Sequence, residues 1–147
     1  MPHDPEIYSF LVAHLEGIFV NNLDRYHKTT HPELSLYEWW VTPHRIDGLP
    51  FHNYMMESNA RLGSVFGLDP QKGIEPRPRF DLANLLIQRY DNTAIASYTL
   101  LTSRTTESGV VVRAHNESRV MVKFEHGWQV VHVHKSPAWN APYQPPD

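Results

Sequence analysis

Proline is missing from one long stretch of the chain, and this limits what the chain can fold into. All 12 prolines lie outside residues 79–136, a stretch rich in Val, Ile, Thr and Tyr. Interior strand residues donate their N–H groups to neighbouring strands, so a proline-free stretch of this composition is typical of β-sheet. The turn-forming pairs are Asp91-Asn92, Ser108-Gly109 and His126-Gly127. They predict four antiparallel strands, at about residues 80–90, 93–104, 110–124 and 128–135.

The first half of the sequence predicts helices. An amphipathic helix follows Asp4, which can cap it, and Pro5, which suits its first turn. Its stripe recurs at helical spacing and consists of Ile7, Phe10, Leu11, His14, Leu15, Ile18 and Phe19. A short helix holding Leu23 and Tyr26 follows, then a short strand over residues 34–40. A further helix runs from Pro50 to Gly63, and a loop occupies residues 64–78.

These elements predict an α+β domain over residues 1–136, with a Pro-rich tail at residues 137–147. The long N-terminal helix packs across the concave side of a strongly curved antiparallel sheet. This packing gives a cone with a cavity at its wide end.

Composition excludes several classes of protein. The chain has no cysteine, which excludes disulfides and thiolate sites. A net charge of −3 argues against a nucleic-acid partner. Apolar runs are far shorter than the ~20 residues of a membrane span. The N-terminus shows no secretory signal, so we expect a cytoplasmic protein.

Both faces of the predicted sheet are substantially apolar, which predicts a homo-oligomer. On the third strand, alternation separates Val112, Ala114, Val120, Val122 and Phe124 from Arg113, His115, Glu117, Arg119 and Met121. On the fourth, it places Trp128 and Val130 with His132 and His134. The predicted oligomer interface consists of Val120, Val122, Phe124, Trp128, Val130 and His132. The alternative is that the tail or the long loop covers this face.

Four segments resemble a known family. Residues 31–38, HPELSLYE, are similar to the D-P-G-x-T-x-F-E segment of the association (hub) domain of calcium/calmodulin-dependent protein kinase II. Residues 47–52, DGLPFH, resemble its E-G-x-D-F-H. Residues 117–120, ESRV, and 127–136, GWQVVHVHKS, resemble its E-T-R-V and W-x-x-V-H-x-H-R-S segments. The resemblance covers nearly the whole chain except the loop at residues 64–78.

This resemblance implies the cone fold of nuclear transport factor 2, which ketosteroid isomerase and the SnoaL-like cyclases share. It also implies self-association, because hub domains pair through their sheets and stack into rings. The 147 residues leave no room for a kinase domain, so we expect a stand-alone hub-like module.

The resemblance also implies cavity residues. Tyr26, His52 and Arg119 match a tyrosine, a histidine and an arginine of the family cavity, and Lys135 replaces a second arginine. A third family arginine is replaced by Leu100. Lysine cannot clasp a carboxylate through two parallel hydrogen bonds, so this replacement weakens or redirects anion binding.

Two cations inside a cone require negative partners. Glu117 supplies one, which leaves an excess of about one positive charge. The sequence therefore predicts a small carboxylate or other anion on Arg119, with Tyr26 and His52 as further donors. The alternative is that Arg119 only neutralises Glu117.

Metal binding and enzymatic activity are the two other functions that the sequence bears on. His132 and His134 share a strand face, but no spacing supplies a third ligand, so we expect neither metal nor cofactor. The alternative function is a SnoaL- or ketosteroid-isomerase-like enzyme acting on a small hydrophobic carbonyl compound. Its possible bases are Glu38, Asp81 and Glu117. No spacing distinguishes them, and His52 has no evident carboxylate partner in the sequence.

Overall fold

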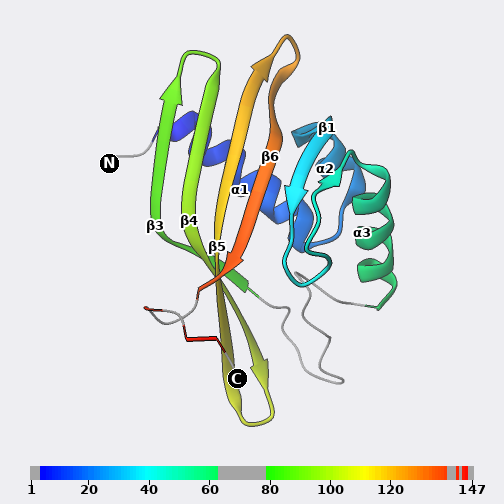
Figure 1. Ribbon diagram of the computed structural model, residues 1–147, viewed down its shortest axis with the longest axis vertical. Coiled ribbons are helices and arrows are strands. Elements are labelled where there is room, and N and C mark those ends of the chain that lie inside the picture. The colour runs from blue at the N-terminus through cyan, green and yellow to red at the C-terminus, as the bar shows by residue number, and fades with distance from the viewer. Residues whose placement is uncertain (1–3, 63–78, 139–141, 143, 146–147) are drawn as a thin grey trace.

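The computed structural model describes residues 4–62, 79–138, 142 and 144–145 (Figure 1). The helices are α1 (Pro5–Phe19), α2 (Leu23–Thr29) and α3 (Pro50–Leu62). The strands are β1 (Thr30–Tyr37), β2 (Ile46–Asp47), β3 (Arg79–Tyr90), β4 (Thr93–Thr106), β5 (Gly109–Phe124) and β6 (Gly127–Pro137). The α+β class and the curved sheet predicted from the sequence are confirmed. The predicted loop at 64–78 lies outside the described residues.

One sheet holds all six strands, in the order β2-β1-β6-β5-β4-β3. The four long strands form the predicted antiparallel hairpins. The sequence did not indicate how the first strand pairs, and β1 pairs in parallel with β6. The strand predicted at residues 34–40 begins earlier, at Thr30, and ends at Tyr37. β6 extends to Pro137, the first residue of the predicted tail.

Helix α1 crosses one face of the sheet, behind it in Figure 1. The Asp4 side chain accepts hydrogen bonds from the backbone N–H groups of Glu6 and Ile7, as the predicted cap requires. Arg89 on β3 forms ion pairs with Asp4 at 2.9 Å and Glu6 at 2.8 Å. Its guanidinium also lies 5.1 Å from the centre of the Trp128 ring. These contacts fix the start of α1 against the sheet.

The core lies between α1 and this inner face of the sheet. The buried stripe of α1 packs on inner-face side chains, which include Ala96, Leu100, Met121 and Val130. Burying such side chains is the main favourable contribution to folding. We call the opposite, uncovered side of the sheet the outer face.

A β-bulge in β6 changes which side chains point inward. Val120 pairs with His132 and Met121 with Val130, so Val131 is an extra residue in the ladder. Simple alternation therefore fails across Val131.

The bulge corrects the predicted interface. Trp128 and Val130 lie in the core of the same chain, on the inner face with Val133 and Lys135. Val130 has no exposed surface, so we leave it and Trp128 out of the interface. His132 remains partly exposed.

Candidate functional site

Four buried charges meet on the inner face of the sheet. Glu117 and Arg119 lie on β5, Lys135 lies on β6, and Glu38 follows the end of β1. Each side chain is at most 3% exposed. We call these four residues the interior charged cluster. Alternation on β5 and the bulge in β6 direct the three strand residues to the same side.

The first ion pair joins neighbours on β5. Arg119 Nη1 donates to Glu117 Oε1 and, at 2.6 Å, to the Tyr98 hydroxyl oxygen. The Tyr98 hydroxyl donates to Glu117 Oε1 at 2.6 Å. His115 Nε2 lies 2.6 Å from Glu117 Oε2. The carboxylate therefore has partners on both oxygens.

The second ion pair joins two distant parts of the chain. Lys135 Nζ donates to Glu38 Oε1 at 2.7 Å and lies 4.0 Å from Glu117 Oε2. It also lies 5.1 Å from the centre of the Trp40 ring. The segment that follows β1 thus brings both a carboxylate and an aromatic face to Lys135.

A tyrosine and a histidine border this cluster. The Tyr26 hydroxyl is hydrogen-bonded to His52 Nδ1. His52 Nε2 lies 3.7 Å from Glu38 Oε1. The structure therefore supplies the carboxylate neighbour that His52 lacks in the sequence.

Burial and charge shift the pKa values of these groups. Burial disfavours the carboxylate form of Glu117, but Arg119, His115 and Lys135 outweigh it and hold the pKa of Glu117 well below its usual value. The pKa of Glu38 is lowered in the same way, because Lys135 outweighs burial. Burial lowers the pKa of His52 to about 4, so its ring is neutral at pH 7.

The structure brings together all five predicted cavity residues, Tyr26, His52, Glu117, Arg119 and Lys135. The predicted excess of positive charge is wrong, because Glu38 neutralises Lys135. Sequence reasoning missed Glu38 in this role, since no spacing relates it to β6. It also missed Tyr98 and His115, although the register of β4 and β5 places Tyr98 opposite Glu117.

The outer face of the sheet carries apolar and ring side chains. Val120, Val122 and Phe124 are partly exposed there. The ring centre of Phe124 lies 4.8 Å from that of His31. Tyr37 and His134 have ring centres 4.9 Å apart.

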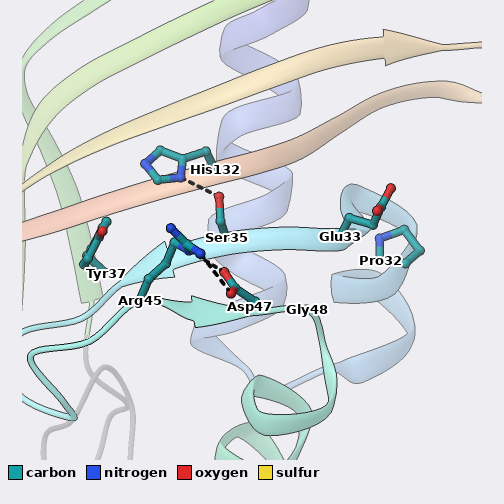
Figure 2. Close-up of a pocket in the computed structure, with 8 residues that line it drawn as sticks. All are labelled: Pro32, Glu33, Ser35, Tyr37, Arg45, Asp47, Gly48 and His132. Atoms are coloured by element: carbon teal, nitrogen blue, oxygen red, sulfur yellow. Dashed lines mark hydrogen bonds and ion pairs between the residues drawn. The ribbon is translucent and has the colours of Figure 1, made fainter.

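A shallow hollow of about 710 Å³ lies at the β1–β2 side of this face (Figure 2). Ser35 Oγ lies 2.7 Å from His132 Nδ1, and Arg45 Nε donates to Asp47 Oδ1 at 2.6 Å. The hollow is lined by Pro32, Glu33, Ser35, Tyr37, Arg45, Asp47, Gly48 and His132. The charges of Arg45 and Asp47 neutralise each other within the hollow.

The described residues hold neither a metal-binding cluster nor a membrane-spanning helix. They contain no group of three or more His, Asp or Glu side chains placed to hold a metal ion. None of the helices described is long and apolar enough to span a bilayer.

Comparison with known proteins identifies the family. The calcium/calmodulin-dependent protein kinase II association domain matches residues 3–139. The chain belongs to this association-domain family. No curated protein sequence matches it.

Solved structures support the fold of this association domain. The S. rosetta CaMKII hub is 21% identical, with a TM-score of 0.71 over 94% of this chain and 100% of that one. The Chlamydamonas reinhardtii CamKII hub homology domain is 24% identical, with a TM-score of 0.74 over 91% and 97%. A putative ketosteroid isomerase from Shewanella frigidimarina is 16% identical, with a TM-score of 0.66 over 90% and 96%.

The ion pair between Glu38 and Lys135 should stabilise this association domain only while both partners are present. Removing either partner from a buried pair costs about 3 to 5 kcal/mol. We expect Glu38→Gln and Lys135→Met each to lower the free energy of unfolding by this amount. The double variant should lose much less than their sum, as measured by urea denaturation. Asp47→Asn, in the exposed Arg45–Asp47 pair, is the control and should change little. Equal effects of Glu38→Gln and Asp47→Asn would contradict the prediction.

Acid should destabilise the domain before its carboxylates titrate. Burial lowers the pKa of both His14 and His52, so the unfolded chain binds protons that the folded chain does not. As pH falls from about 6.5 towards 4, each histidine should reduce stability by about 1.4 kcal/mol per pH unit. In urea titrations, His52→Gln should lower this slope by the contribution of about one proton. An unchanged slope in His52→Gln would show that His52 does not contribute.

Proposed function

We propose that this chain is a homo-oligomerising hub-like module that associates through the outer face of its sheet. The observation that carries the proposal is the partly exposed apolar surface of Val120, Val122 and Phe124. Among the described elements, no helix covers this side of β5 and β6 (Figure 1). The partly exposed His132 lies beside it on β6.

Two arguments support a second copy of the chain as the partner. An antiparallel sheet with one face in water normally alternates polar and apolar residues, and β5 does not. The family to which the chain belongs is an association domain. A symmetric pair of outer faces would remove these apolar side chains from water in both copies.

A charge on this face should prevent association. Val122→Glu would bury an unpaired carboxylate, at a cost of several kcal/mol. We expect light scattering to give at least the dimer mass for the unmodified chain at micromolar concentration and 17.1 kDa for Val122→Glu. The control is Lys123→Glu, which changes charge at an exposed neighbour on the opposite face of the strand. A mass of 17.1 kDa for the unmodified chain would refute the proposal.

We also propose that the interior binds a small carboxylate. Arg119 Nε supports this role, because it is buried and has no hydrogen-bond partner among the described residues. Tyr26 and His52 lie beside the same cluster. Since the four charges of the cluster balance, the ligand would bind through this donor and not through excess charge.

A proton-transfer enzyme acting on a small carbonyl compound is the second candidate. The specific observation in its favour is the row formed by Tyr26, His52 and Glu38. A hydrogen bond joins Tyr26 to His52, and the Glu38 carboxylate lies 3.7 Å from the other ring nitrogen, beyond hydrogen-bond distance but close enough to take a proton after a small movement. Burial keeps the imidazole neutral at pH 7.

Arg119→Lys tests the carboxylate site, because lysine retains the positive charge beside Glu117 but lacks the Nε donor. Calorimetric titration with acetate should show saturable binding to the unmodified chain, about tenfold weaker in Arg119→Lys. Absence of saturable heat at millimolar acetate would exclude the carboxylate site.

An enzyme would instead catalyse deuterium exchange beside the carbonyl of cyclohexanone, and His52→Gln would abolish it. Absence of exchange in the unmodified chain would exclude this activity for that probe.

A further inference from the structure

A two-stranded arm extends beyond the strands that flank it. β3 pairs with β4 only as far as Ser103, and β6 pairs with β5 only from His115. Residues 104–114, which we call the arm, therefore have no flanking strand in the part of the chain that the structure describes. Figure 1 shows this hairpin projecting from one end of the sheet.

The arm exposes apolar surface on both faces. Val110, Val111 and Val112 are 67%, 38% and 58% exposed. Successive strand residues point to opposite faces, so three consecutive valines place apolar surface on both faces of the arm, and Arg104 and Arg113 share the face of Val111. A two-stranded hairpin is at best marginally stable in water, and this one lacks a hydrophobic face packed on the core. The arm is therefore marginally stable by itself, and it exposes apolar surface that a partner would cover.

The edge strand β3 and the β5 side of the arm differ in their protection against pairing with another chain. β3 carries Arg79, Asp81 and Arg89, and its ladder is interrupted by a bulge between Ala83 and Leu86. Charges and bulges of this kind prevent a strand edge from pairing with another chain. Residues 109–112 of the arm, Gly-Val-Val-Val, contain neither device. Beyond the end of β6, no described strand pairs with this side of β5, which leaves it as an edge for strand addition.

We propose that two copies of this chain pair antiparallel along the arm's β5 edge, about a two-fold axis at Val111. This register sets Val111 beside the partner's Val111 and Val110 beside the partner's Val112. Cross-strand pairs of β-branched residues stabilise antiparallel ladders. The register also brings the positive Arg113 to the turn that carries the partner's Glu107. The contact is separate from the outer face and does not depend on it.

The absence of cysteine allows a direct test. Residues facing each other in an antiparallel pair have Cα atoms about 4.5 to 5.5 Å apart, which a disulfide can bridge. Under mild oxidation, Val111→Cys should form a covalent dimer at least about tenfold faster than Lys123→Cys. Lys123 is the matched control, because it is exposed on the same strand but pairs with β6 on one side and donates its backbone N–H to Asn92, in the β3–β4 turn, on the other. Equal rates for the two variants would overturn the proposal.

Second substitutions distinguish this contact from the outer-face contact. Adding Val112→Lys to Val111→Cys should suppress the cross-link, because it places a charge beside the partner's Val110. Adding Val122→Glu should leave the cross-link in place. Loss of the cross-link with Val122→Glu, but not with Val112→Lys, would assign it to the outer face and overturn arm pairing. The unfolding midpoint of each variant checks that its fold is retained.

Discussion

The ion pair between Glu38 and Lys135 ties the segment after β1 to the inner face of β6, across 97 positions of sequence. Beside it, Glu117 and Arg119 form the second pair of the cluster. Burial disfavours an isolated charge on any of these groups. Each carboxylate and each cation is therefore compatible with the interior only because the others are present. The inward direction of the charged side chains of β5 and β6 and the position of the segment after β1 are compatible with burial only in this arrangement.

One departure from the cavity residues of the family is consistent with the balance of charges in the cluster. Leu100 stands where the resemblance places a further cavity arginine, and its side chain is fully buried in the core. A third cation would have no matching carboxylate among the four cluster residues. The interior is thus organised around two pairs of opposite charge. A ligand that enters it must use hydrogen-bond donors and apolar contacts, since the cluster offers no net charge.

Much of the fold could be predicted from residue pattern. The proline-free stretch located the four long strands, and the cap at Asp4 and the stripe of α1 located the first helix. Alternation alone separates the two faces of β5 and puts Glu117 and Arg119 on one of them, and the family resemblance implied that this face lies inside. Alternation failed in β6, because the pattern of residues 128–135 does not show that Val131 is an extra residue. Glu38 could not be predicted as the partner of Lys135, because their contact depends on the parallel pairing of β1 with β6. The cytoplasmic location and the limits of the C-terminal tail stay predictions.

The contacts of Arg89 have a geometric consequence for attachment. They hold the first turn of α1 beside the end of β3, near the turn between β3 and β4 (Figure 1). β6 runs the other way and reaches Pro137 at the far end of the sheet. A domain joined ahead of Asp4 and a domain joined after Pro137 would thus leave from opposite ends of the same rigid sheet.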